Sequence, residues 1–188
     1  MSNHPTKTNN TNLNAKVYLR THFLDKQKEY KVLDCYHGTG EIWKSVKNKG
    51  YNISVVGIDK KENATIKGEN LKVLPTLDLD QFDIIDLDAY GMPIKQLEII
   101  FSKVKTEKII YVTYIQTLFG GLDRILLEKI GYTKEMIVKC PTLFFKNAFN
   151  KLVIYLTSKG IKDIYYIEQS SNKYYISFKI NPVIGAIQ

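Results

Sequence analysis

The stretch VLDCYHGTG, residues 32–40, joins an apolar run that reads as a strand to a turn built on Gly38 and Gly40. Glycines allow the chain to turn sharply and let a ligand come close to the backbone. The next segment, residues 41–50, carries apolar residues on one helical face and ends at a glycine. A strand, a glycine turn and a helix in this order favour a ligand site at the helix N-terminus, where free N–H groups point outward.

The same alternation of strand and helix continues along the chain. Buried strands are predicted at residues 30–36, 53–59, 64–70, 82–88 and 108–115. Helical segments separate most of them, as expected for a parallel α/β sheet. After two further helix-like segments, residues 162–169 and 173–180 read as two strands joined by a tight turn. The sequence therefore predicts an α/β fold whose mostly parallel sheet ends in an antiparallel hairpin.

An acid at the end of the second strand adds to the glycine turn. Asp59 follows Gly40 by 19 positions, where a carboxylate can accept hydrogen bonds from both hydroxyls of a ribose. Alone, Asp59 would more simply be a helix cap or a solvent-facing acid. Together with the glycine turn, it favours a cofactor that contains a nucleoside. Trp43 stands where the dinucleotide fingerprint needs a third glycine, which argues against a pyrophosphate.

Composition indicates a globular protein. A chain of 188 residues fits one domain at about 100–200 residues per domain. Residues 1–12 are polar, so we expect a flexible tail followed by a single domain over residues 13–188. No apolar run reaches the ~18 residues of a membrane-spanning helix, and no membrane partner is expected. Two distant cysteines favour neither a disulfide framework nor a metal site, so we expect a reducing cytoplasmic location.

Positive charge is the other compositional feature. The chain has 27 Lys and Arg against 19 Asp and Glu, a net charge of +8. Such an excess is typical of proteins with a polyanionic partner, although a lysine-rich solvated surface explains it equally well. Lys16 and Arg20 precede the first strand. They would cover the site as a lid, contact phosphate or, as we expect, contribute only surface charge.

Four motifs in order resemble those of class I S-adenosylmethionine-dependent methyltransferases. VLDCYHGTG resembles the first motif, VVGID the second, IKGEN the third and FDIIDLDAYG the fourth. The resemblance covers about residues 30–180. It implies the Rossmann-like class I methyltransferase fold, with a mostly parallel seven-stranded sheet whose last two strands form the hairpin. It also implies methyltransferase activity with S-adenosylmethionine as the cofactor.

The resemblance assigns roles to the residues that occupy the family's motif positions. Asp34 would hold the cofactor's ammonium group, Asp59 its ribose hydroxyls, and the Gly38–Gly40 loop its methionine part. Glu69 or Asn70 would contact the adenine amino group. The short spacing from Asp59 to Glu69 predicts that the family's helix between the second and third strands is missing or reduced to a turn. Three neighbouring residues complete the candidate cofactor site: Tyr36, His37 and Lys60.

The fourth motif points to the acceptor of the methyl group. Asp88, Ala89 and Tyr90 occupy the place of D-P-P-Y in the family's amino-methylating members, and IDLDAYG differs from the DLDPYG of tRNA guanine-N2 dimethyltransferases by Ala89 for Pro. An exocyclic amine is a poor nucleophile that needs hydrogen-bond acceptors and a stacking ring to orient it. We therefore expect Asp88 and the Ala89 carbonyl to accept from the amine and Tyr90 to stack on the base. Asp83 and Asp86 are expected to have structural roles.

These observations lead to one favoured function and three alternatives. The favoured function is an N-methyltransferase acting on a nucleic-acid base, with RNA, including tRNA, slightly ahead of DNA. The chain carries no obvious base-reading module, so the N-terminal tail, a partner subunit or RNA shape would supply specificity. The alternatives are a small-molecule methyltransferase, a protein methyltransferase and a non-catalytic subunit that keeps the fold for binding, which Ala89 in the fourth motif keeps open.

Overall fold

The computed structural model describes residues 12–60, 63–115, 124–140, 148–170 and 172–181. Its strands form one seven-stranded sheet in the order β3-β2-β1-β4-β5-β7-β6. Strand β7 is antiparallel to both of its neighbours, whereas the pairs among β1 to β5 are parallel. The strands are β1 Glu29–Asp34, β2 Asn52–Asp59, β3 Ile66–Lys67, β4 Ile84–Leu87, β5 Lys108–Ile115, β6 Ile164–Ser170 and β7 Lys173–Ile180.

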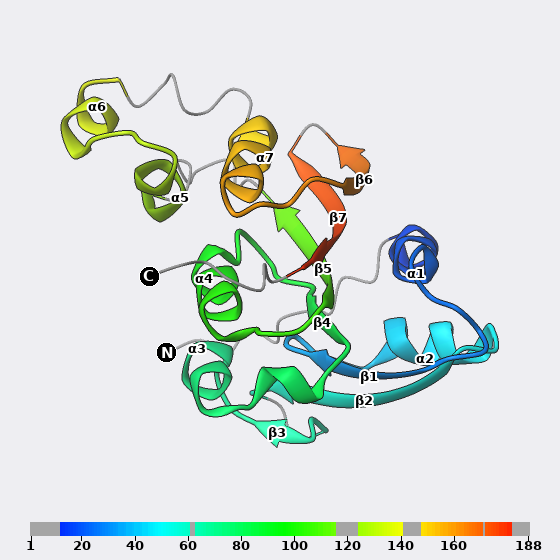
Figure 1. Ribbon diagram of the computed structural model, residues 1–188. Coiled ribbons are helices and arrows are strands. Elements are labelled where there is room, and N and C mark those ends of the chain that lie inside the picture. Colours follow the sequence, from blue (N-terminus) through cyan, green and yellow to red (C-terminus); the bar gives the residue numbers. More distant parts are fainter. Residues whose placement is uncertain (1–11, 61–62, 116–123, 141–147, 171, 182–188) are drawn as a thin grey trace, which may run out of the picture.

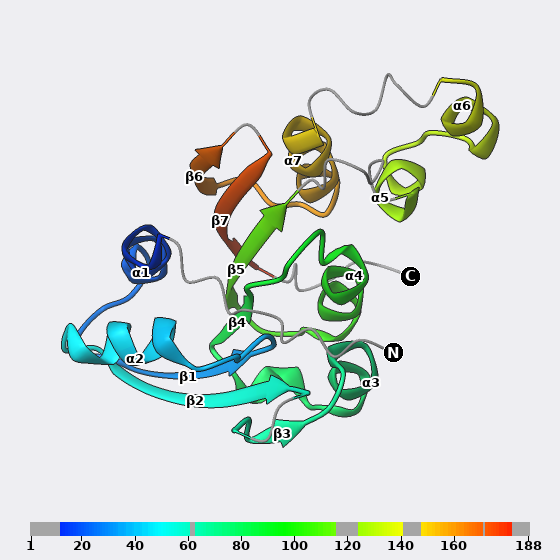
Figure 2. The same cartoon turned by 180° about the vertical axis from the view of Figure 1, so that it is seen from behind.

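Helices cover both faces of this sheet (Figure 1), and the view from behind in Figure 2 shows α1 on one side with α4 and α7 on the other. The α-helices are α1 Leu13–Thr21, α2 Glu41–Asn48, α3 Asn70–Val73, α4 Ile94–Lys103, α5 Arg124–Lys129, α6 Lys134–Lys139 and α7 Ala148–Ser158. Two short 3-10 turns, η1 Leu74–Thr76 and η2 Leu79–Gln81, lie between α3 and β4. Among the described residues, no helix is both long enough and apolar enough to cross a membrane.

The core consists of two hydrophobic clusters, one on each face of the sheet. The smaller cluster packs α1 and α2 against the strands, with Val17 and Trp43 among its buried residues. The larger cluster packs α4, α5 and α7 against the opposite face. Strand β5 is buried on both faces, because Tyr111 contacts the smaller cluster and Val112 the larger one. A near-continuous apolar run such as KIIYVTYI is what a central strand of an α/β sheet requires.

The prediction of a mostly parallel α/β sheet that ends in an antiparallel hairpin is confirmed. The predicted strand over residues 108–115 has the observed bounds of β5, and the hairpin is β6 and β7. The third strand is shorter than predicted, since β3 has only two residues. The described residues between β2 and β3 form no helix, as the short spacing predicts. The expected flexible tail lies outside the described residues except for Asn12.

Candidate functional site

The carboxyl ends of β1 and β2 hold the glycine loop in place. Gly38 and Gly40 have φ values of 53° and 71°, a backbone region that disfavours residues with a Cβ. The Gly38 N–H donates to Asp59 Oδ2 at 2.8 Å, and the Asn63 side-chain amide donates to the Gly38 carbonyl at 2.7 Å. Asp59 therefore links the glycine loop after β1, which is the first motif, to the end of β2, which is the second motif.

A cleft of about 470 Å³ opens beside this loop. Its volume lies within the range of about 300–1,000 Å³ that is usual for small-molecule sites. The cleft is formed at the ends of β1, β2 and β3 and by residues of α3 and α4, at the carboxyl edge of the sheet where α/β proteins bind ligands. It is lined by Cys35, Tyr36, Ile58, Asp59, Lys60, Gly68, Glu69, Asn70, Leu71 and Gln96.

Five of the predicted cofactor residues line the cleft: Tyr36, Asp59, Lys60, Glu69 and Asn70. The Gln96 side-chain amide donates to the Tyr36 hydroxyl at 2.8 Å, and burial raises the pKa of Tyr36. Lys60 and Glu69 form an ion pair of 2.7 Å on the exposed rim. The hydrogen bond from Lys60 holds the pKa of Glu69 below its ordinary value. The cleft thus combines a partly buried tyrosine ring with a charged rim.

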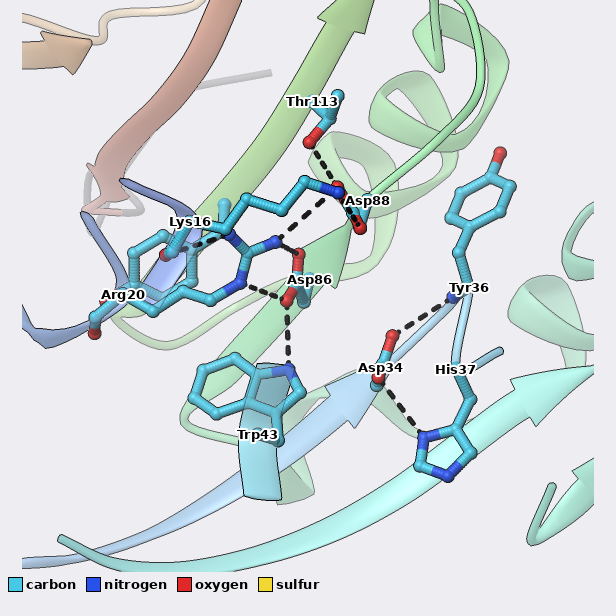
Figure 3. A network of polar contacts seen from close by, with 10 residues as sticks. Lys16, Arg20, Asp34, Tyr36, His37, Trp43, Asp86, Asp88 and Thr113 are labelled. Atoms are coloured by element: carbon cyan, nitrogen blue, oxygen red, sulfur yellow. Dashed lines mark hydrogen bonds and ion pairs between the residues drawn. The ribbon is translucent and has the colours of Figure 1, made fainter. Parts of the chain in front are cut away.

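Asp34 and His37 lie next to the cleft rather than in its lining. Asp34 is buried at the end of β1, where its Oδ1 accepts the Tyr36 N–H at 3.2 Å. The Nδ1 of His37 lies 3.2 Å from Asp34 Oδ2 (Figure 3). This hydrogen bond raises the pKa of His37 above its ordinary value. Both carboxylate oxygens of Asp34 therefore already have a partner, the Tyr36 N–H on Oδ1 and the His37 ring on Oδ2.

A row of acids follows Asp34 along the same face of the sheet. Asp34 stands opposite Asp86 in the parallel register of β1 and β4. Because side chains two residues apart on a strand point to the same face, Asp88 follows Asp86 towards the end of β4. This is the face covered by α1 and α2. Three carboxyl groups therefore gather beneath these two helices.

Helix α1 supplies the cations that pair with the last two acids. The Arg20 guanidinium makes a bidentate contact with Asp86, with Nε–Oδ2 at 2.7 Å and Nη2–Oδ1 at 2.8 Å. The Trp43 indole N–H also donates to Asp86, at 2.9 Å. The Lys16 ammonium lies 2.7 Å from Asp88 Oδ2, and the Thr113 hydroxyl donates to Asp88 Oδ1. Figure 3 shows these side chains converging from α1, α2, β4 and β5.

The expectation that Lys16 and Arg20 contribute surface charge is wrong. Their exposed fractions are 5% and 1%, because both point inward at the acids of β4. The two residues are four apart on α1, so they share one face of the helix with its apolar residues. A helix that lies over a row of buried carboxylates has to present cations there, since an isolated buried charge is costly. The structural role expected of Asp86 agrees with these contacts.

Burial and pairing act in opposite directions on the two acids. Burial raises the pKa of Asp86 to about 7, although Arg20 opposes this effect. Burial also acts on Asp88, but there Arg20, Lys16 and Thr113 outweigh it and hold the pKa below its ordinary value. Asp88 is therefore a hydrogen-bond acceptor at neutral pH rather than a group that takes up protons.

The residues after Asp88 differ sharply in exposure. Ala89 is buried, and its N–H donates to the Leu87 carbonyl at 2.7 Å. Tyr90 is 87% exposed, the largest value among the exposed large hydrophobic residues of the described chain. An exposed aromatic ring at the carboxyl edge of a sheet can stack on a planar ligand. The structure thus places an exposed ring two residues after the paired acid.

Several residues of this region escaped the sequence analysis. Gln96, Gly68 and Leu71 line the cleft, and Thr113 contacts Asp88. Gly68 lies inside the third motif, IKGEN, and Leu71 directly follows it. Gln96 and Thr113 come from α4 and β5, so no local pattern connects those two with the motifs. Lys16 and Arg20 did carry a signal, because two cations at a spacing of four share a helix face with Val17.

Comparison with known proteins shows similarity in structure but not in sequence. No family model matches the chain, and no curated protein matches it. A SAM-dependent methyltransferase from Archaeoglobus fulgidus has a TM-score of 0.54 and 16% identity, over 88% of this chain and 92% of that one. Trm1 from Pyrococcus horikoshii, solved with S-adenosyl-L-methionine, has a TM-score of 0.57 and 16% identity, over 90% and 54%. TYW2 from M. jannaschii, solved with AdoMet, has a TM-score of 0.53 and 12% identity, over 89% and 75%.

Proposed function

Because this chain has the fold of class I S-adenosylmethionine-dependent methyltransferases, we propose that it is an N-methyltransferase that acts on a nucleic-acid base. RNA, including tRNA, is favoured over DNA. One observation carries the proposal: the cleft at Asp59 and the exposed ring of Tyr90 open at the same edge of the sheet, the carboxyl ends of its parallel strands. A cofactor site and an acceptor site have to share one edge if a methyl group is to pass between them.

The residues around the cleft fit S-adenosylmethionine. Asp59 would accept from the ribose hydroxyls, and Glu69 or Asn70 from the adenine amino group, each of them in the lining of the cleft. Asp34 would hold the ammonium group beside the Gly38–Gly40 loop. The cofactor supplies an electrophilic methyl group. The cleft would bind a ligand without pyrophosphate, since Trp43 fills the space under the helix and donates to Asp86.

Asp88 retains hydrogen-bonding capacity for the acceptor amine. A carboxylate offers about two acceptor positions on each oxygen. Lys16 occupies one on Oδ2 and Thr113 one on Oδ1, so each oxygen retains acceptor capacity, and 13% of the side chain is exposed. The fixed carboxylate would orient the amine while the Ala89 carbonyl accepts its second proton. Tyr90 would stack on the base, an interaction that contributes about 1–3 kcal/mol per base in single-stranded nucleic acids.

The net charge of +8 supports a polyanionic acceptor. Such an acceptor binds through lysines that release counterions, so its affinity should fall steeply as salt rises. We expect a partner subunit or the shape of the RNA to supply specificity beyond the single base. The two unpaired cysteines, Cys35 and Cys140, fit the reducing cytoplasm as the place of action.

Methyl transfer to bulk nucleic acid tests the proposal. Purified protein is incubated with methyl-labelled cofactor and separately with total RNA, RNA-free DNA, a protein extract and a small-molecule extract. Label is expected in RNA, in a nucleoside methylated on an exocyclic nitrogen after digestion. Label confined to protein or to small molecules would refute the nucleic-acid acceptor and favour those alternative methyltransferases.

A second candidate is a non-catalytic subunit that uses the same fold for binding. It is favoured by the state of Asp88, whose two oxygens already contact Lys16 and Thr113, and by Ala89 where the family pattern has proline. This candidate predicts that the protein binds S-adenosylhomocysteine or RNA but transfers no label to any of the four fractions. A partner protein that restores transfer would then identify the catalytic chain.

A further inference from the structure

His37 is fixed in its position by the backbone on two sides. A Cβ at Gly57 would overlap the His37 ring, and a Cβ at Gly40 would lie 2.9 Å from its Cε1. The His37 N–H donates to the Ile58 carbonyl at 3.1 Å, and its carbonyl accepts the Gly40 N–H at 2.8 Å. The ring therefore fills the space between the loop and β2, and its side chain is 19% exposed. Glycines at positions 40 and 57 are what this placement requires.

This placement directs one ring nitrogen at Asp34. Nδ1 lies 3.2 Å from Asp34 Oδ2, while Oδ1 accepts the Tyr36 N–H. With neutral His37, the Nδ1–H donates to the carboxylate and leaves its negative charge in place. A protonated ring would add a positive charge at the same oxygen. Other charged groups that act on His37 include Asp59, from the end of β2.

The remaining acids of the row have cations of their own. Asp86 pairs with Arg20 and Asp88 with Lys16, both from α1. Asp34 contacts the titratable ring of His37 instead. Arg20 and Asp86 also act on Asp34 electrostatically, and burial raises the pKa of Asp86 to about 7. Of the described groups that form a hydrogen bond with Asp34, His37 is the one that titrates.

From this geometry we infer that His37 is a positioning residue for Asp34 and that its protonated ring competes with the cofactor's ammonium group for that carboxylate. The inference rests on the proposed function, because it takes Asp34 as the residue that holds the ammonium. Neutral His37 fixes the carboxylate by one hydrogen bond. Protonated His37 neutralises it and repels a second cation, so the cofactor should bind better at pH values where the ring is neutral.

Calorimetry with S-adenosylhomocysteine tests the inference without any methyl acceptor. For the wild type, we expect affinity at about pH 5.5 to be roughly tenfold weaker than at about pH 8, as one charge–charge interaction in a partly solvated site predicts. His37→Asn keeps an N–H donor near the position of Nδ1 but cannot titrate. Its affinity should stay close to that of the wild type at high pH and should not weaken as the pH falls.

Proton NMR of the ring supplies the reciprocal measurement. Linkage requires that if protonation weakens ligand binding, ligand binding lowers the pKa of His37. The His37 signal is assigned by its absence in His37→Asn, and the other two histidines serve as internal controls. Thermal melting of both proteins at each pH shows that they are folded.

The possible outcomes distinguish a failure of this inference from a failure of the proposed function. Equal pH dependence in the wild type and His37→Asn, or a His37 pKa unchanged by ligand, would overturn the inference and leave cofactor binding established. No binding of S-adenosylhomocysteine to either protein at any pH would overturn the proposed function, and the inference with it.

Discussion

The contact between Arg20 and Asp86 offers a direct test of how helix α1 is held on the sheet. Both side chains are 1% exposed, and two guanidinium nitrogens lie within 2.8 Å of the carboxylate. Arg20→Met keeps most of the buried stem and removes the charge. Trp43 then remains as one neutral donor to Asp86. The variant leaves a buried carboxylate without its cation.

Loss of one partner of a buried ion pair costs about 3–5 kcal/mol, because the other group either keeps a desolvated charge or has to take up a proton. At 1% exposure water does not screen this ion pair, so the full cost is expected. For a domain of this size, we expect the melting temperature to fall on the order of 10 °C. Adding Asp86→Leu should recover most of the loss, since the pair itself contributes little net stability compared with apolar side chains.

Urea unfolding measures these free energies. Far-UV circular dichroism follows the whole chain, and the fluorescence of Trp43, the chain's one tryptophan, follows the surroundings of Asp86. Arg124→Met is the matched control, because Arg124 is 55% exposed and lies 3.5 Å from Glu128. We expect that control to cost less than about 0.5 kcal/mol. A loss below about 1 kcal/mol for Arg20→Met would refute the reasoning, because Asp86 then either keeps an unpaired buried charge or takes up a proton at neutral pH, and both cost more than that.

Three further predictions concern the acceptor end and the acid stability of the chain. Asp88→Ala should lower methyl transfer by about a hundredfold or more, with little change in S-adenosylhomocysteine affinity; full activity would make Asp88 a purely structural residue. Tyr90→Ala should weaken RNA binding by about 1–3 kcal/mol, whereas Tyr90→Phe, which keeps the stacking ring, should bind almost normally in a fluorescence anisotropy titration. Partial burial alone would raise the pKa of Glu98, but hydrogen bonds from Tyr155, Lys129 and Lys159 outweigh it and lower this pKa from 4.5 to about 2. Glu98 therefore stabilises the fold above its ordinary pKa and loses this effect as the pH falls from about 5 towards 2, so Glu98→Gln should reduce the acid loss of stability by on the order of 1 kcal/mol in urea unfolding.

The sheet could be predicted from sequence because its signals are local. Buried strands such as KIIYVTYI are continuous apolar runs, and the glycine turn at residues 38–40 follows one of them directly. Asp59 could be found because the order of strand, turn, helix and strand places it beside that turn. The structure shows the contact, since Asp59 accepts the Gly38 N–H.

The pairing of the acids could not be predicted in the same way. Lys16 and Asp88 are separated by 72 positions, and which cation meets which acid depends on how α1 lies across the sheet. The position of His37 also depends on tertiary structure, because its ring direction follows from Gly57 on another strand. The sheet and the glycine loop can thus be predicted from the hydrophobic pattern of the sequence. The pairing of charged groups at the site depends on tertiary packing.

Binding of S-adenosylhomocysteine to the wild type and to Asp59→Ala tests the central claim that the cleft at the ends of β1 and β2 is a cofactor site. Isothermal titration calorimetry should give saturable binding to the wild type. Affinity should be about tenfold to a hundredfold weaker for Asp59→Ala, the value of one or two charge-assisted hydrogen bonds. Asp163→Ala, at an exposed position by the opposite edge of the sheet, should bind as the wild type does. No binding to the wild type, or equal affinity in a folded Asp59→Ala, would contradict the assignment.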